Sequence, residues 1–365
     1  MPFKADTLKY RAYTYATNKS PITSKEQTIK LVKKANGYGV QSKNVLIKVH
    51  SASLNPVDLL LYNSAYKPLK WIYGEQGIGR DYSGVVADIG EKAASKTGLK
   101  VGDEVAGFYR HPFGRGTVAE YIELDPTVDK AIVKKPKNLS FTEASSFPLV
   151  YGTAYLMMKQ HDVKGKKVLV LGGSTSVGKY IVQLAKIRGA KVIVTSNSPR
   201  SNDLVKRLGS TNQIDYTKNK NLLNPVLESV KESGKFDYIY DTCGNSDLFS
   251  QISSVLAPKS TGSAYITCVG DGKYDYGNIH LLKVVVENFW VTVRSLKAKL
   301  GLGFNFSLAL LEPELEWIQD AKNNFEQGNL EVFIDSVHKW DNFNDAVDKI
   351  KYNKANGKVV VETDA

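Results

Sequence analysis

The spacing of apolar and polar positions changes near residue 150. Before it, short β-branched or alternating runs separated by Gly and Asp predict strands, as in NVLIKVHSASLN, GVVADIG, DEVAGFY and AEYIELD. After it, helical periods over residues 142–160, 178–189, 200–209 and 221–233 alternate with the strands VLVLG, KVIVTS, FDYIYDT and GSAYITCVG. The first pattern predicts an all-β, barrel-like domain, and the second predicts a parallel sheet with helices on both faces.

The chain after residue 312 has a mixed pattern. PELEWIQDAKNNFEQG predicts a helix that ends at Gly328, DNFNDAVDKIKYNKANG predicts another, and KVVVE predicts a terminal strand. With 365 residues, the chain is long enough for two domains, each with its own core. The expected fold class is therefore α/β, with a β-rich domain and a doubly wound parallel sheet.

Composition narrows the class of protein. A hydrophobic fraction of 42% and a charged fraction of 24% are typical of a soluble globular chain. Two cysteines, Cys243 and Cys268, are too few for a disulfide framework or a Cys-ligated zinc. The N-terminal stretch lacks the apolar core of a signal peptide, and no apolar run is long enough to predict a membrane-spanning helix.

The net charge is +12, from 49 basic and 37 acidic residues. Such a balance suits a polyanion, an anionic membrane or an anionic cofactor, and it equally suits plain solubility. The lysines are dispersed, and no motif combines basic and aromatic residues in the manner of a nucleic-acid reader. We therefore expect no nucleic-acid partner.

A glycine-containing turn carries the clearest functional signal. Residues 168–186 read VLVLGGSTSVGKYIVQLAK, which is an apolar run, a turn and a helix within a stretch of βαβ length. Such a turn directs backbone N–H groups and a helix dipole at a phosphate, although a tight turn without a ligand has the same pattern. The predicted cofactor-binding residues of the turn are Gly173, Ser174, Thr175, Ser176, Val177 and Gly178.

Thr175 takes the place of the middle glycine of the usual motif. Its Cβ lies where the backbone would approach a pyrophosphate, and for that reason we expect weaker dinucleotide binding. In return, we expect its hydroxyl, with those of Ser174 and Ser176, to donate to phosphate oxygens. Gly178 allows the helix to pack closely against the strand.

Several stretches, in order along the chain, carry a family resemblance. They are SASLNPVD, GRDYSGVVADIG, VGDEVAG, GTVAEY, SSFPLVYGTAY, VLVLGGSTSVGKYIVQLAK, LGSTNQIDY, FDYIYDTCGN and NGKVVVE. Together they resemble the zinc-free medium-chain dehydrogenases/reductases of the quinone oxidoreductase branch, in particular fungal members associated with lipid droplets and mitochondria and chloroplast-envelope quinone oxidoreductase-like proteins. The resemblance implies a GroES-like β-barrel catalytic domain over residues 1–150, completed by 313–365, and a Rossmann dinucleotide-binding domain over 151–312.

The resemblance also bears on metal binding. Zinc alcohol dehydrogenases of the superfamily have a cysteine ligand where this chain has Asn55, and the His-Glu pair of a G-H-E motif where it has Arg80 and Asp81. Neither asparagine nor arginine is a usual zinc ligand. We therefore expect no zinc and no alcohol oxidation through a zinc alkoxide. Reduction of a conjugated C=C bond needs only a hydride at the β-carbon and a proton at the α-carbon.

The end of the second Rossmann strand indicates the cofactor. An acidic residue there would bind the ribose 2′-hydroxyl of NAD, and its absence beside a basic residue admits a 2′-phosphate. Ser196 stands at that position and Arg200 follows, although Arg200 also suits an ordinary solvated helix start. By resemblance, Tyr216 lies near this phosphate, and Gly152 and Thr153 approach the nicotinamide. We expect NADP(H).

Asn55, Asp58 and Tyr66 are the candidate catalytic residues. By resemblance, Asn55 and Tyr66 line the nicotinamide or the substrate, and a tyrosine at this spacing is the proposed proton donor of 2-enoyl thioester reductases. A phenol suits that role, but with 20 tyrosines in the chain a packing or solvated role is open as well. We expect Asp58 and Asp81 to organise the site by accepting backbone hydrogen bonds.

Residues 279–300 belong to a longer connection than compact quinone reductases have. On a helical wheel one face carries Leu282, Val286, Phe289, Val293, Leu296 and Leu300, and Lys283, Arg294 and Lys297 form a stripe beside it. Such a helix suits a membrane or lipid-droplet surface, or a lid over an apolar substrate. A core segment or a contact between two copies fits the pattern too, and the β-branched triplets would permit a strand.

These observations support two functions. The first is an NADPH-dependent, zinc-independent oxidoreductase that reduces a small apolar quinone or α,β-unsaturated carbonyl, including lipid-derived ones. The second is a non-enzymatic interaction protein of a lipid surface that kept the fold after its dinucleotide turn decayed. We expect a cytoplasmic chain, or one bound peripherally to lipid droplets or mitochondria through residues 279–300. Relatives commonly dimerise through the edge of the Rossmann sheet, which leaves a homodimer open.

Overall fold

The chain divides into two compact units. The computed structural model describes residues 3–111, 113–219 and 221–363. Unit 1 comprises Met1–Leu149, Asp275–Leu281 and Glu312–Ala365, and unit 2 comprises Val150–Tyr274 and Leu282–Leu311. The segment Asp275–Leu281 therefore packs with unit 1, whereas the sequence placed it inside the expected Rossmann domain.

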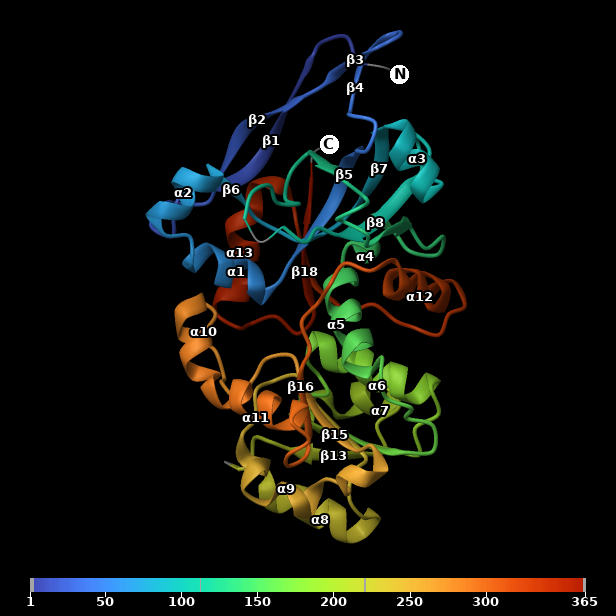
Figure 1. Cartoon of the computed structure of the whole chain (residues 1–365), viewed down its shortest axis with the longest axis vertical. Coiled ribbons are helices and arrows are strands. Elements are labelled where there is room, and N and C mark those ends of the chain that lie inside the picture. The colour runs from blue at the N-terminus through green and yellow to red at the C-terminus, as the bar shows by residue number, and fades with distance from the viewer. Residues whose placement is uncertain (1–2, 112, 220, 364–365) are drawn as a thin grey trace. The chain divides into compact units, whose positions relative to one another are not determined.

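The main sheet of unit 1 joins strands from distant parts of the chain. Its strands are β5 (Val45–Leu54), β7 (Asp81–Ile89), β8 (Glu104–Phe108), β9 (Tyr121–Leu124), β10 (Ile132–Lys134), β17 (Ile334–His338) and β18 (Lys358–Glu362). They lie in the order β10-β8-β7-β5-β18-β17, and β9 also pairs with β5 (Figure 1). Because β18 runs antiparallel to β5, with Val359 opposite Leu54, the C-terminal strand extends the N-terminal sheet.

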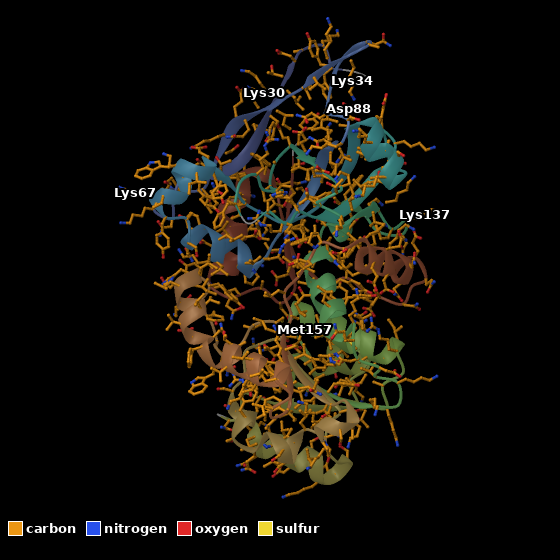
Figure 2. The ribbon with its side chains drawn as sticks, in the orientation of Figure 1. Lys30, Lys34, Lys67, Asp88, Lys137 and Met157 are labelled. Atoms are coloured by element: carbon orange, nitrogen blue, oxygen red, sulfur yellow. The ribbon has the colours of Figure 1, made fainter. Side chains whose placement is uncertain are left out.

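Unit 1 also contains smaller strands and short helices. β1 (Thr7–Tyr15) pairs with β2 (Thr23–Lys30) and β6 (Gln76–Gly77), and β3 (Val32–Lys34) pairs with β4 (Gly37–Gly39). The helices are α1 (Pro56–Asn63), α2 (Lys67–Tyr73), α3 (Glu91–Thr97), α4 (Phe141–Ala144), α12 (Leu315–Glu326) and α13 (Phe343–Lys351). The carboxylate of Asp88, near the end of β7, accepts hydrogen bonds from the N–H of Val40 at 2.7 Å and from Lys34 at 3.3 Å (Figure 2), which ties the β3–β4 hairpin to the main sheet.

The central position of β5 explains the apolar run VLI at its start. Val45, Leu46, Ile47 and Val49 are fully buried, so both faces of the strand are covered. Both faces are therefore apolar over residues 45–47, whereas Lys48 and His50, further along the strand, are only half-buried. The VLI run predicted from the sequence is therefore the centre of the core of unit 1.

Unit 2 is built on a parallel sheet whose strand order reverses in the middle. Its strands are β11 (Lys167–Leu171), β12 (Val192–Asn197), β13 (Asn212–Asp215), β14 (Tyr238–Asp241), β15 (Ala264–Thr267) and β16 (Asn305–Leu308). They lie in the order β13-β12-β11-β14-β15-β16 (Figure 1), and each neighbouring pair is parallel. The predicted doubly wound α/β sheet is confirmed. Such sheets bind ligands at the point of reversal, here between β11 and β14.

The helices of unit 2 connect these strands. They are α5 (Pro148–Met158), which starts in unit 1, α6 (Ser176–Ile187), α7 (Asn202–Leu208), α8 (Leu223–Ser233), α9 (Ile252–Val255), α10 (Leu281–Glu287) and α11 (Phe289–Lys299). The single helix predicted over 142–160 is two helices, α4 and α5, because Pro148 lacks an N–H and suits the first position of a new helix. In the described part of the chain, no helix is long and apolar enough to cross a membrane.

Helix α6 lies very close to the end of β11. Its side chains Ile181, Val182 and Leu184 are buried. A Cβ on Gly178 would lie only 2.1 Å from the carbonyl oxygen of Gly172. A side chain at position 178 would force the helix away from the strand, which is the packing role predicted for Gly178.

Gly178→Ala tests this contact. Helix propensity alone favours alanine over glycine by about 1 kcal/mol. The close approach to Gly172 reverses the sign, and we expect the free energy of unfolding to fall by about 1–3 kcal/mol, as in other overpacked cores. Urea denaturation of the full chain measures this change. Lys186→Ala, at an exposed position of the same helix, should change it by less than about 0.5 kcal/mol. A Gly178→Ala variant that is more stable than the wild type would contradict the packing argument.

Candidate functional site

The turn after β11 does not need a glycine at position 175. Thr175 has φ −66° and ψ 162°, an extended conformation open to any residue. The positive φ of the turn, +82°, falls on Gly172 instead. The threonine therefore causes no backbone strain, and the turn keeps its shape without the middle glycine.

The Thr175 hydroxyl is used inside the protein. Its Oγ1 accepts a hydrogen bond from the N–H of Gly178 at 2.9 Å and so caps α6. It also lies 2.8 Å from Oγ1 of Thr242. The single proton of Thr242 is directed to the carbonyl oxygens of Leu171 and Gly172, at 2.9 and 3.0 Å. The Thr175 hydroxyl thus has two partners inside the protein, and the hydrogen bond to a phosphate predicted for it stays a prediction.

The start of α6 still offers donors to an anion. The N–H groups of Ser176 and Val177 have no partner within the described chain, as expected in the first turn of a helix. The hydroxyls of Ser174 and Ser176 make no hydrogen bond there either, and both residues are half-buried. These donors lie at the positive end of a twelve-residue helix. The pyrophosphate of a dinucleotide fits this set.

Gly173 and Ser196 join the turn to β12. The N–H of Gly173 donates to the carbonyl oxygen of Ser196 at 3.0 Å, and the N–H of Gly172 donates to Oγ of Ser196 at 2.9 Å. A Cβ on Gly173 would lie 2.6 Å from Cβ of Thr195, so only glycine fits. Ser196 is buried and holds the turn, so its side chain does not face a ribose. The position carries no carboxylate that would repel a 2′-phosphate.

Arg200 and Tyr216 lie at the same edge of the sheet as the turn. Arg200 is exposed in the short 3-10 helix Pro199–Ser201 after β12, and it forms no ion pair within the described residues. Tyr216 directly follows β13 and is 51% exposed. Since β12 and β13 are parallel neighbours, their carboxyl ends share one edge. The structure thus brings Ser196, Arg200 and Tyr216 to the side of the turn where the adenosine end of a dinucleotide is expected.

A buried carboxylate that the sequence analysis missed shapes the next loop of unit 2. Asp241 ends β14 and accepts hydrogen bonds from three consecutive N–H groups, those of residues 243–245, at 2.9–3.1 Å. The phenol of Tyr265 donates to the same carboxylate at 3.0 Å. Burial raises the pKa of Asp241 to about 6, and the backbone donors oppose the rise. Asp241 therefore fixes the loop from which Thr242 reaches the dinucleotide turn. In the sequence, the only indication of this role was that an acidic residue ends an apolar strand.

Unit 1 contains a buried ion pair between Asp81 and Lys358. The Nζ atom of Lys358 lies 2.7 Å from Oδ2 of Asp81 and 2.5 Å from Oδ1 of Asn55. The Nδ2 atom of Asn55 donates to Asp81 at 3.0 Å. The other oxygen of Asp81 accepts the N–H of Leu149 at 2.8 Å. Lys358 is 4% exposed and Asp81 is fully buried. One carboxylate therefore joins β7, β18, the end of β5 and the start of α5.

Asn55 and Asp58 have positioning roles in this cluster. Asn55 is 1% exposed, and both polar atoms of its side chain bond to the ion pair. The side chain therefore holds the cluster. The prediction was different: Asn55 was expected to line the nicotinamide or the substrate. Asp58 accepts the backbone N–H groups of Asn55 at 2.7 Å and Gly79 at 3.2 Å, which are the backbone hydrogen bonds predicted for it. Burial raises the pKa of Asp58 to about 6, and the nearby guanidinium of Arg80 opposes the rise.

These residues do not fit a zinc ion. The guanidinium of Arg80 donates to the carbonyl oxygen of Gly79 at 2.9 Å. The ammonium of Lys358 stands against Asp81 and Asn55, where it would repel a cation. Across residues 3–111, 113–219 and 221–363, no group of three or more His, Cys, Asp and Glu side chains is arranged to hold a metal.

Tyr66 lies apart from the buried cluster. It directly precedes α2, is 46% exposed and makes no side-chain hydrogen bond within the described chain. The structure brings Asn55 and Asp58 together but does not add Tyr66 to them, and proton donation by Tyr66 stays a prediction. Gly152 and Thr153 are buried in α5, and their approach to a nicotinamide stays a prediction as well.

The residues predicted to share one helix face lie on two helices, α10 and α11, separated at Asn288, and most are exposed, whereas Val293 is half-buried. Among them, Leu282, Val286, Phe289, Leu296 and Leu300 are 57–66% exposed on α10 and α11 and at the end of α11. The predicted basic stripe needs a correction. The guanidinium of Arg294 forms an ion pair with Asp271 and lies 3.9 Å from the ring centroid of Phe249, so it packs inward and does not join Lys297 at the surface.

Sequence comparison identifies relatives of the whole chain. The alcohol dehydrogenase GroES-like domain matches residues 41–137, and the zinc-binding dehydrogenase family matches residues 176–302. Protein YIM1 of Saccharomyces cerevisiae is 32% identical, over 96% of this chain and 97% of its own length. The match to a family described as zinc-binding lies in unit 2 apart from Asp275–Leu281, while the altered ligand positions Asn55 and Arg80 lie outside the matched range.

Solved structures share the fold. The quinone oxidoreductase from Coxiella burnetii has a TM-score of 0.72 at 22% identity, over 97% of this chain and 99% of its own. The CurK enoyl reductase has a TM-score of 0.69 at 20% identity, over 98% of this chain and all of its own. With the YIM1 match over nearly its full length, the chain belongs to the medium-chain dehydrogenase/reductase superfamily and is related there to the fungal YIM1 proteins.

Proposed function

We propose that the chain is a zinc-independent oxidoreductase that uses NADPH to reduce a quinone or an α,β-unsaturated carbonyl by hydride transfer. The observation that carries the proposal is the set of free donors at the start of α6, beside a strand end that has no carboxylate. The superfamily uses nicotinamide dinucleotides, and its solved members include a quinone oxidoreductase and an enoyl reductase of the same fold.

The residues of unit 2 account for binding of the phosphates. Val177, Ser174 and Ser176 would hold the pyrophosphate through N–H and hydroxyl groups. Arg200 would bind the 2′-phosphate, which Ser196, unlike an acidic residue, does not repel. The net charge of +12 favours association with such an anion. When bound, the cofactor supplies a hydride.

The residues of unit 1 favour a conjugated acceptor. The cluster around Asp81 is occupied by the Lys358 ammonium, so it offers no place for a metal that would polarise an isolated carbonyl. An enone takes the hydride at its β-carbon and a proton at its α-carbon, whereas a quinone becomes a hydroquinone with both added hydrogens on oxygen. In both cases the developing charge is delocalised onto oxygen, so the acceptor needs less help. The proton for the α-carbon has to come from a weak acid. The exposed phenol of Tyr66 is our candidate donor.

Arg200→Ala tests the choice of cofactor. We expect the Kd for NADPH to rise about tenfold, because a charge-assisted contact of about 1.4 kcal/mol is lost. The Kd for NADH should change less than about twofold on the same scale, since NADH carries no 2′-phosphate. Titration of the purified chain, followed by cofactor fluorescence, measures both constants.

Lys206→Ala is the matched control for this experiment. Lys206 is exposed on α7, close to Arg200 in the chain, and its replacement removes the same charge. An equal loss of NADPH affinity in both variants would mean that only net charge matters. No saturable binding of either cofactor to the wild type would overturn the proposed function.

Thr175→Val and Thr175→Ser separate capping from phosphate binding. Valine keeps the bulk but leaves the N–H of Gly178 without its acceptor, so we expect the free energy of unfolding to fall by about 1 kcal/mol. The affinity for NADPH should fall as well, because the turn loses the hydrogen bond that holds it to α6. Serine keeps the hydroxyl and should stay close to wild type in both measurements. If valine weakens NADPH binding but leaves thermal and urea stability unchanged, the hydroxyl contacts the phosphate after all.

A second function is favoured by the uncovered apolar face of α10 and α11. Large aromatic and aliphatic side chains there face solvent, and the exposed lysines Lys297 and Lys299 lie at the end of α11. A helix with an apolar face and basic neighbours suits the boundary of an anionic lipid layer. We therefore propose peripheral binding to a lipid-droplet or mitochondrial surface, compatible with the reductase or independent of it.

Phe289→Ser tests the lipid contact. In flotation with vesicles that contain phosphatidylserine, we expect the bound fraction to fall about tenfold, because burial of one large apolar side chain stabilises by about 1.5–3 kcal/mol. Val101→Ser, at an exposed apolar position of unit 1, should leave flotation unchanged. Absence of vesicle binding by the wild type, together with a dimer in light scattering that Phe289→Ser dissociates, would assign the face to a second copy of the chain.

A further inference from the structure

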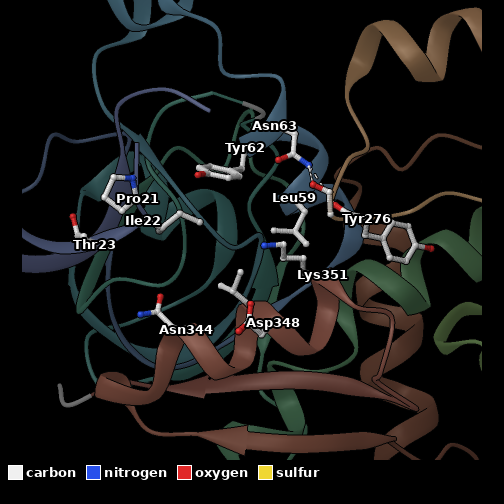
Figure 3. A pocket seen from close by; sticks show the side chains of 12 residues that line it. Pro21, Ile22, Thr23, Leu59, Tyr62, Asn63, Tyr276, Asn344, Asp348 and Lys351 are labelled. Carbon is white, nitrogen blue, oxygen red and sulfur yellow. Dashed lines mark hydrogen bonds between the residues drawn. The ribbon is translucent and has the colours of Figure 1, made fainter. Parts of the chain in front are cut away.

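A cavity of about 320 Å³ lies within unit 1, separate from the dinucleotide turn and the buried cluster. It is formed by α1, α13, the residues before and at the start of β2, and the segment Asp275–Leu281. Figure 3 shows Ile22, Leu59, Tyr62 and Lys351 around one space, while the ring of Tyr276 points away from it. Its volume lies at the lower end of the range for small-molecule sites.

One wall of the cavity is apolar and already organised. It consists of Pro21, Ile22, Leu59 and Tyr62, and Val347 adds an apolar side chain from α13. Tyr62 does not offer its hydroxyl to a ligand, because it donates to the carbonyl oxygen of Ser20 at 2.8 Å. Tyr62 is also fixed edge-on against the ring of Tyr15, with centroids 5.0 Å apart. This wall therefore suits an apolar part of a ligand.

The opposite wall is a polar stripe on α13. Asn344, Asp348 and Lys351 recur at helical spacing and line the cavity (Figure 3), while Phe343, Ala346 and Ile350 face the core. Asp348 and Lys351 are one turn apart, the spacing at which opposite charges on a helix can pair. Nevertheless, within the described residues neither side chain forms an ion pair or hydrogen bond. The three residues of the stripe are exposed, and the ammonium of Lys351 lies 5.3 Å from the ring centroid of Tyr352. The stripe thus presents an anion and a cation side by side, neither of them in an ion pair within the described residues.

The charges decide the class of ligand. A simple carboxylate would be attracted by Lys351 and repelled by Asp348. A simple amine would be attracted by Asp348 and repelled by Lys351. A zwitterion with adjacent ammonium and carboxylate groups satisfies both at once. The apolar wall selects an uncharged hydrophobic side chain. We propose that this cavity binds a free apolar α-amino acid, with its carboxylate toward Lys351, its ammonium toward Asp348 and its side chain against Leu59 and Ile22.

A ligand in this cavity would also touch the segment Asp275–Leu281. Tyr276 and Gly277 line the cavity, and Nδ2 of Asn63 donates to both of their carbonyl oxygens at 3.3 Å. At the end of the segment, the N–H of Leu281 donates to Oγ of Ser64 at 2.8 Å. The segment leaves unit 2 and returns to it along the chain. Occupancy of the cavity should therefore slow amide exchange over residues 276–281.

Calorimetric titration of the full chain tests the proposal with L-phenylalanine and two analogues. N-acetyl-L-phenylalanine lacks the ammonium group, and phenethylamine lacks the carboxylate. We expect saturable binding of L-phenylalanine and about tenfold weaker binding of each analogue, which corresponds to the loss of one charged contact. Absence of saturable binding at millimolar L-phenylalanine, or equal binding of all three compounds, overturns the proposal.

Matched variants locate the site. Lys351→Gln and Asp348→Asn should each weaken L-phenylalanine binding about tenfold. Lys354→Gln and Asp345→Asn remove the same charges outside the cavity and should leave binding unchanged. If the controls weaken binding as much as the cavity variants do, the site lies elsewhere. NADPH titration of the same samples should give one Kd for all four variants, so that failure of this proposal and failure of the proposed reductase function are distinguished.

Discussion

Unit 1 depends on the buried ion pair between Asp81 and Lys358. Moving two charges out of water costs several kcal/mol per ion, and attraction offsets this only where the remaining lone pairs and protons find partners. Here the ammonium meets two oxygens, and the carboxylate also receives donors from Ser53, Asn55 and Leu149. Loss of either charge would leave the other buried without compensation, which costs about 3–5 kcal/mol. The C-terminal strand β18 is therefore required for the geometry of segments that lie far from it in the sequence.

The same device, a buried carboxylate that gathers backbone N–H groups, recurs where loops must be held. Asp58 fixes the junction of β5 and α1 to the backbone before β7, and Asp241 fixes the loop after β14. In both cases burial raises the pKa to about 6 and hydrogen bonding opposes the rise. These carboxylates do not reach a substrate. Their effect is to hold backbone segments, since each of them accepts two or more backbone N–H groups.

The sequence predicted what depends on local period and on the size of single residues. The apolar runs and helical stretches gave the α/β architecture, and Gly178 was assigned its packing role because a helix after such a turn must approach the strand closely. Contacts with residues distant in the sequence could not be predicted in this way. A lysine that opens the strand KVVVE looks like a solvated end, and nothing local shows that Lys358 meets Asp81, 277 positions away. Arg294 was predicted to lie in a surface stripe for the same reason. Its contacts with Asp271 and Phe249 arise only when the chain is folded, and no local pattern indicates them.

Thr175 shows how a motif can lose a residue and keep its geometry. In the usual motif, the middle glycine is the position at which the backbone approaches the pyrophosphate. In this chain the required positive φ belongs to Gly172, and position 175 is extended, so a side chain there is sterically free on the protein side. Its hydroxyl then takes over one of the orphan N–H groups of α6 and anchors the turn to Thr242. The N–H groups of Ser176 and Val177 remain without a partner in the described part of the chain. The threonine therefore ties the turn to the start of α6 and to Thr242 through hydrogen bonds that a glycine could not make.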